Sequence, residues 1–143
     1  MAETAETVIK DALSFINAIR EEEPLAAADA QLAIRVLNRM MAAYTAEGLD
    51  LLYTPVDSLA SLITTPAVLI EGMVHILGLK LYPHFHKTPP DALVLGLAAK
   101  GYQNFVHYAI SVDDVIFAAT VPRGSGNTAP EENVSPFYPG EDI

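Results

Sequence analysis

Histidine and carboxylate side chains are the groups in this sequence best suited to chemistry, and one pair has metal-ligand spacing. Glu71 and His75 are four residues apart, which places both on one face of a helix within reach of a shared ion. His84 and His86 flank Phe85 directly after that segment. No second ligand cluster stands at a recognised spacing. We therefore interpret these side chains as partly exposed loop or interface residues and predict no metal site.

The other candidate groups do not form a catalytic set either. His107 lies between aromatic residues of the last expected helix, and we interpret it as an ordinary packing residue. The acidic run 21–23 is most simply a solvated loop, whereas Asp113 and Asp114 would point to opposite faces of a strand. No nucleophile elbow, phosphate-binding loop or dinucleotide-binding motif is present. The sequence therefore predicts no catalytic residues, no cofactor and no enzymatic activity.

Composition and charge limit the classes of function. The chain has 143 residues, of which 51% are hydrophobic, and its net charge is -10. That length suits one domain with a sizeable core, and so much apolar surface favours oligomerisation. Only eight Lys and Arg residues are present, which argues against a protein that grasps a nucleic-acid backbone. The absence of cysteine excludes disulfides, thiolate metal sites and cysteine nucleophiles.

Neither a signal peptide nor a membrane span is expected. The N-terminus is acidic and lacks the basic and apolar regions of a signal peptide. The most apolar stretch, residues 67–81, is short for a bilayer span and contains Glu71, His75 and Lys80. We expect a soluble intracellular protein.

Hydrophobic spacing predicts four helices. The first contains Val8 to Ile19 and ends before Pro24. The second covers about 26–47, is apolar over a wide arc, and is closed by Gly48 in a left-handed conformation. An arc that wide indicates contact with more than one neighbour.

Prolines indicate where the third and fourth helices begin. The third begins at Thr65 as a cap with Pro66 in its first position, and should stop at Pro83. Glycines within it predict close packing against another helix. The fourth begins with Thr88 as a cap and reaches about Ile110.

Extended structure is expected elsewhere. Residues 49–64 should form a loop with one or two short strands, and 112–117 another short strand. From Val121 the chain is rich in Pro and Gly and cannot build its own core. We predict a mostly α fold, a bundle of about four helices over residues 1–120 followed by an extended C-terminal tail at 121–143.

The tail contains large apolar side chains, which are unusual in a linker that stays free in solvent. A tail that docks on a partner would bury them. The predicted docking residues are Val134, Pro136, Phe137, Tyr138 and Ile143.

The helical part of the chain, roughly Val8 to Ile110, resembles the tail accessory factor, or packaged-DNA stabilisation, family of short-tailed phages. This family is a branch of the phage head-to-tail adaptors. The resembling segments are Asp11–Ile16, Pro24–Ala30, Ala33–Met41, Ala46–Leu49 and Glu71–Pro83. The last stretch of the chain departs from the family, whose tails vary.

The resemblance implies a structural protein of the virion, present in the host cytoplasm during assembly. It implies a ring of identical subunits, expected to be twelvefold, that docks on the portal protein after genome packaging and helps retain the DNA. The tail would reach along the portal, and the opposite side would receive a downstream tail or nozzle protein. Double-stranded DNA would pass through the lumen without specific binding, which the acidic charge favours.

Two other classes of function remain open. A small helical binding or regulatory module would work as a monomer or dimer, which native mass would distinguish from a ring. A virion-associated hydrolase would need an acid/base pair. Neither alternative involves a membrane.

Overall fold

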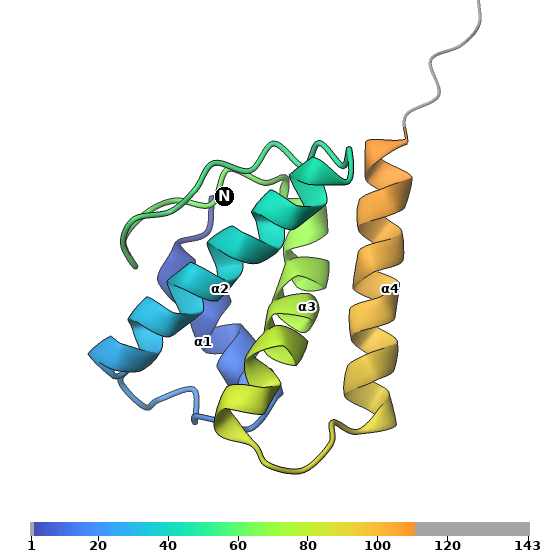
Figure 1. The fold of residues 1–143 in the computed structure, drawn as a ribbon. Helices are drawn as coiled ribbons and strands as arrows, with labels where there is room; N and C mark the ends of the chain where they lie inside the picture. Colours follow the sequence, from blue (N-terminus) through green and yellow to red (C-terminus); the bar gives the residue numbers. More distant parts are fainter. Residues whose placement is uncertain (1, 111–143) are drawn as a thin grey trace, which may run out of the picture. The chain divides into compact units, whose positions relative to one another are not determined.

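Four helices make up the part of the chain that the computed structural model describes, residues 2–110 (Figure 1). They are α1 (Ala5–Phe15), α2 (Ala27–Ala46), α3 (Ala67–Phe85) and α4 (Ala92–Ala109). The mostly α fold class and the four helices predicted from the sequence are confirmed. The predicted strand at 112–117 and the boundary at residue 120 lie outside the described residues.

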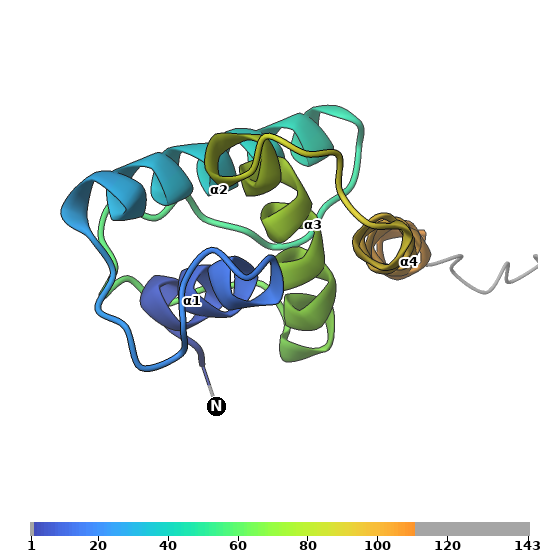
Figure 2. The same ribbon diagram turned by 90° about the horizontal axis from the view of Figure 1, so that it is seen from below.

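The central helix of this body is α3. It packs against all three other helices, whereas the backbone of α4 lies close to that of α3 alone. Both ribbon views show α3 between α1 and α4 (Figures 1 and 2). Such a position requires apolar or small side chains around most of the helix. Its buried residues are Leu69, Ile70, Gly72, Met73, Ile76, Leu77, Gly78 and Leu81.

Two glycines of α3 allow its neighbours to approach closely, as their presence in a helix predicted. A Cβ on Gly72 would lie 3.0 Å from the Cα of Gly101 in α4. A Cβ on Gly78 would lie 2.9 Å from the Phe15 ring and 3.1 Å from the carbonyl oxygen of Ala12 in α1. These contacts leave no room for a side chain, so glycine fixes both helix crossings.

The first helix ends earlier than predicted, because a left-handed residue stops it well before Pro24. Asn17 has a φ of 57°. The N–H of Ala18 donates to the carbonyl of Leu13 (2.9 Å), and that of Asn17 to Ser14 (3.0 Å). This Schellman pairing satisfies the last carbonyls of α1. The predicted close of the second helix is confirmed, since Gly48 has a φ of 91°.

The N-caps of α3 and α4 both lie later in the sequence than predicted. Pro66, rather than Thr65, is the N-cap of α3, and the cap of α4 is Asp91, rather than Thr88. Neither cap uses a side-chain hydrogen bond. Pro66 has an extended ψ of 140°, so it lies outside the helix, which begins one residue later than predicted, at Ala67.

Pro83 does not stop α3, contrary to the prediction. It lies inside the helix, whose last residue is Phe85. Proline has no N–H and so removes one backbone hydrogen bond of a helix. Because Pro83 lies in the last turn of α3, this loss affects only the end of the helix. The N–H of His86 still donates to the carbonyl of Tyr82 (2.9 Å), so the final turn closes.

The segment between α2 and α3 forms no strand, so the predicted short strands are wrong. Its one β-type pairing is an isolated bridge between Leu62 and Thr4. Its conformation is set instead by Asn38 of α2, whose side chain accepts from the Tyr53 hydroxyl (2.7 Å) and the Val56 N–H (3.0 Å) and donates to the Val56 carbonyl (2.9 Å). A half-buried side chain supplies the partners that a neighbouring strand would otherwise provide.

Candidate functional site

Exposed apolar side chains gather on α4 and its C-terminal cap. Five of the eight large hydrophobic residues exposed in the described part of the chain belong there: Leu93, Leu95, Tyr102, Tyr108 and Ile110. Single exposed apolar residues are ordinary, whereas a concentration of them on one element marks an interaction surface.

Two apolar stripes run along α4. The first is buried against the body and consists of Val94, Ala98, Gly101 and Phe105. The second faces solvent, with residues spaced mostly three and four apart, as on one face of a helix. We call this second stripe the α4 outer face, and it consists of Ala92, Leu95, Ala99, Tyr102, Val106 and Ile110. It carries no charge, and only Val106 is half-buried.

The C-terminal end of α2 holds one edge of this face in place. The Tyr102 hydroxyl donates to Oε2 of Glu47 (3.1 Å), and its ring lies 5.6 Å from that of Tyr44. The hydrogen bond to Glu47 and its charge raise the pKa of Tyr102. Phe105 fills the gap behind, with its ring edge-on to Tyr44 at 5.7 Å. The face is therefore supported by packing although its outer side is open.

Leu52 adds exposed apolar surface at the C-terminal end of α4. Its φ is 55°, a left-handed conformation that costs roughly 1–2 kcal/mol for a residue with a Cβ. Its N–H donates to Oδ1 of Asp50 (3.1 Å), and its carbonyl accepts from the Thr64 hydroxyl (2.7 Å). Leu52 lines an open hollow of about 400 Å³ with Asp50, Tyr108 and Ala109. Hydrogen bonds thus hold a leucine out in solvent beside α4.

The structure brings Glu71 and His75 together with α4, but not as a metal site. Both line a polar hollow of about 130 Å³ with Lys100 and Asn104, where the helices cross at their glycines. Within residues 2–110 no group of three histidines or acids could hold a metal ion. The His75 ring lies 4.7 Å from that of Phe15, so part of it serves packing.

The other histidines have structural or exposed positions. Nε2 of His86 lies 2.7 Å from the carbonyl oxygen of Ile16. A carbonyl only accepts, so this nitrogen carries the proton and ties the end of α3 to the end of α1. His84 is exposed. His107 is exposed as well, so its interpretation as a packing residue is wrong, because it lies on the solvent side of α4.

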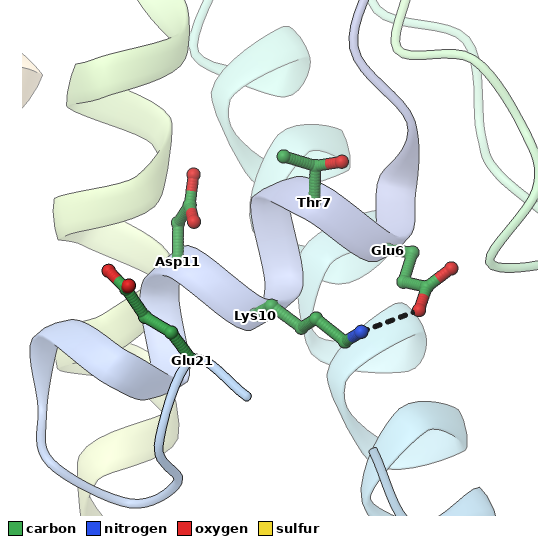
Figure 3. A pocket seen from close by; sticks show the side chains of 5 residues that line it. All are labelled: Glu6, Thr7, Lys10, Asp11 and Glu21. Carbon is green, nitrogen blue, oxygen red and sulfur yellow. Dashed lines mark ion pairs between the residues drawn. The ribbon is translucent and has the colours of Figure 1, made fainter. Parts of the chain in front are cut away.

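An acidic hollow lies on the outer side of α1 (Figure 3). It has a volume of about 370 Å³ and is lined by Glu6, Thr7, Lys10, Asp11 and Glu21, which we call the α1 hollow. Lys10 pairs with Glu6 at 2.8 Å. Partial desolvation of its carboxyl by the neighbouring residues, together with the charge of Glu21, raises the pKa of Asp11 even though its side chain is largely exposed. Two carboxylates, those of Asp11 and Glu21, thus share one region without an ion pair to the described residues.

The arrangement in the α1 hollow supports binding better than catalysis. A raised carboxyl pKa beside a second carboxylate is the electrostatic setting of acid catalysis. Here, however, Asp11 and Glu21 are both exposed, and nothing among the described residues excludes water from them. A cationic group of a partner would relieve their mutual repulsion.

Sequence reasoning missed the α4 outer face, although its signal was present. Two apolar stripes on one helix are more than α3 alone can cover. The wide apolar arc of α2 is used inside the body, since none of the exposed large hydrophobic residues in the described part belongs to α2. The predicted docking residues Val134, Pro136, Phe137, Tyr138 and Ile143 lie outside the described residues.

No protein-family model matches the chain, and no curated protein is significantly similar to it in sequence. The resemblance to the adaptor family therefore depends on the segments named above. Among the described helices, none has the length and apolar character needed to cross a bilayer.

Proposed function

We propose that this chain is a structural head-to-tail adaptor of a short-tailed phage. It forms a ring beneath the portal protein, extends the DNA channel, retains packaged DNA and provides the platform for the next tail component. The observation that carries the proposal is the α4 outer face. A helix with one stripe buried and a second, uncharged apolar stripe exposed belongs to a subunit of an assembly.

Charge supports the same role. The net charge is -10, and the described residues contain no cluster of Lys and Arg of the kind that holds a phosphate backbone. Repulsion by an acidic or neutral lumen lets DNA pass without being retained by the wall. We expect an inner wall without a continuous cationic belt, which a structure of the assembled ring would test.

Docking on the portal is assigned to the tail, residues 121–143. Phe137 and Tyr138 stand between Pro136 and Pro139, and flanking prolines reduce the conformational freedom lost on binding. Aromatic anchors typically cost about 2 kcal/mol or more when truncated at an interface. When several subunits of one ring bind the portal at once, their tails together bind much more tightly than a single tail would.

The experiment uses truncation after Thr120 and the double variant Phe137→Ala, Tyr138→Ala. Both should keep the helical circular-dichroism signal and the melting temperature, because the described core lies before residue 111. Both should lose binding to the portal protein of the same genome in co-sedimentation. If the double variant melts many degrees lower while its folded fraction still binds portal, these aromatics belong to the body and the docking role is wrong.

A second candidate, a monomeric or dimeric helical binding module, is favoured by the same α4 outer face, which would accept a partner helix. Native mass of the portal mixture separates it from the adaptor. A third, a virion-associated hydrolase, would use Asp11 and Glu21. An Asp11→Asn variant that abolishes cell-wall hydrolysis without changing assembly would favour that enzyme over the adaptor.

A further inference from the structure

We propose that the α4 outer face of one copy pairs with the α4 outer face of a second copy, as two antiparallel helices related by a twofold axis. This inference goes beyond the proposed function, because it concerns the free protein before it meets a portal. A twofold contact needs a surface that is complementary to itself. The spacing, charge and side-chain sizes of this face meet that requirement.

The residues of this face follow the seven-residue repeat of a helix that packs along another helix. Alternating steps of three and four residues separate Ala92, Leu95, Ala99, Tyr102 and Val106. The next step of three reaches Ala109, which is half-buried. Apolar residues in this repeat form the seam along which two helices pack side by side. The expected occupant of the face is therefore an α-helix.

No charged side chain enters this seam. Lys100, the one Lys, Arg, Asp or Glu of α4, instead lines the polar hollow with Glu71 and His75 at the crossing with α3. Gly96 and Gln103, which follow the seam on its solvent side, are uncharged. Two such faces can approach each other without burying an unpaired charge.

Side-chain sizes match in one antiparallel alignment. When the twofold axis passes between residues 100 and 101, the large side chains of the seam lie opposite smaller ones. The facing pairs are then Tyr102 with Ala99, Leu95 with Val106, and Ala92 with Ala109. A parallel alignment would instead bring two Tyr102 rings together and leave two Ala99 methyl groups facing each other, which packs less evenly.

The body of the protein holds this face ready for a partner. Both ribbon views show α4 at the edge of the helical body (Figures 1 and 2). The Tyr102 hydroxyl donates to Oε2 of Glu47 (3.1 Å), and its ring lies 5.6 Å from that of Tyr44 while remaining exposed. A side chain that is already held in place loses little conformational freedom on contact with a partner.

The size of the face predicts a weak pair. The 18 residues of α4 span about 27 Å, and one helix face buries less than the roughly 800 Å² per partner of a standard stable interface. The net charge of -10 on each copy also opposes association. We therefore expect a dimer only near the highest soluble concentrations, well above micromolar. Such a pair separates readily when the chain enters a larger assembly.

Sedimentation equilibrium of the full chain without portal tests the pair, with Leu95→Glu and Leu93→Glu as matched variants. Both leucines are exposed on α4, and only Leu95 belongs to the α4 outer face. The unchanged chain should show a reversible monomer–dimer equilibrium that strengthens with added salt, because screening weakens the repulsion between copies. Leu95→Glu should weaken the dimer by about tenfold or more, since it places a charge in the seam, whereas Leu93→Glu should change it by less than about twofold.

Two results of this measurement would overturn the pair. One is an equal effect of the two glutamate variants, because it would show that the seam is not the contact. The other is a chain that stays monomeric at every soluble concentration. That result would mean that the face has another occupant, such as the portal protein or residues 111–143.

Cysteine variants test the antiparallel alignment, because the chain has no cysteine of its own. Ala92→Cys and Ala109→Cys mark opposite ends of α4, about 26 Å apart. When the two variants are mixed and oxidised, the disulfide between them should form in clear excess over either homodisulfide. It should also exceed any product with Gln31→Cys, a control on an exposed position of α2. An excess of the two homodisulfides would indicate a parallel pair and overturn the alignment.

Adding portal protein separates this inference from the proposed function. Dimers that dissociate and join a ring on the portal support both. Dimers that persist beside the portal support the pair and contradict the adaptor. Rings on the portal, formed by a chain that never pairs when free, keep the adaptor function and overturn the pair.

Discussion

Gly101→Ala should destabilise the helical body, although alanine is the better helix former. A Cβ on Gly101 would lie 2.8 Å from the Cα and 2.9 Å from the carbonyl oxygen of Gly72. Ordinary contact begins near 3.4 Å, so α3 and α4 would have to separate by about 0.6 Å, the difference between these two distances. Both obstructing atoms are backbone and cannot rotate away.

The magnitude follows from two opposing effects. Replacing helical glycine by alanine stabilises by about 0.5–1 kcal/mol, whereas overpacking costs about 1–3 kcal/mol. Separation of the helices also loosens Phe105, which is fully buried next to Gly72. We expect a net loss of roughly 1–2 kcal/mol.

Gly96→Ala is the matched control on the same helix. A Cβ there meets nothing within 4 Å, so only the propensity gain remains and the melting temperature should rise by roughly 2–8 °C. Thermal unfolding of dilute protein, followed by circular dichroism, measures both variants. If Gly101→Ala rises as Gly96→Ala does, the close helix crossing is wrong.

Four further substitutions test other parts of the body. Thr65→Val should stabilise by about 1 kcal/mol in urea unfolding, because the buried hydroxyl has no hydrogen-bond partner among the described residues; a loss would reveal a hidden partner. Asn38→Ala should cost about 2 kcal/mol, since it frees the half-buried Tyr53 hydroxyl and Val56 N–H; an unchanged urea midpoint would contradict this. Burial raises the pKa of Tyr53 from 10 to about 12, so unfolded chains ionise first and stability should fall between pH 10 and 12. Tyr53→Phe should make that fall smaller, and the raised pKa of Tyr44 and Tyr102 accounts for the part that remains. Asp11→Asn should raise the melting temperature at pH 7 but not at pH 3, because the raised pKa marks an unfavourable charge.

Local chemistry made much of this fold predictable from the sequence. The apolar spacing of each helix set its buried stripe, and Gly48 ended α2 because glycine readily accepts a positive φ. The glycines of α3 correctly indicated close packing. The predictions that were wrong concern segments whose conformation depends on tertiary contacts. Asn17, a residue that tolerates the left-handed region, ended α1, and Asn38 of α2 replaced the expected strand pairing.

The candidate surfaces were harder to predict, because exposure is a property of the whole body. Leu95 and Phe105 are both apolar residues of one helix, and only the position of α3 makes the first exposed and the second buried. Likewise, Asp11 and Glu21 come together only because α1 ends early and the chain turns back. Periodicity identifies that two stripes exist and cannot say which one the body covers.

The mass of the protein mixed with the portal protein of its own genome tests the central claim most directly. The adaptor account predicts monomers in the free protein at micromolar concentration and one large complex with portal, containing many copies in a closed ring that is expected to be twelvefold. Portal and monomer that stay separate under these conditions would contradict the account, as would a stable dimer that never joins a ring.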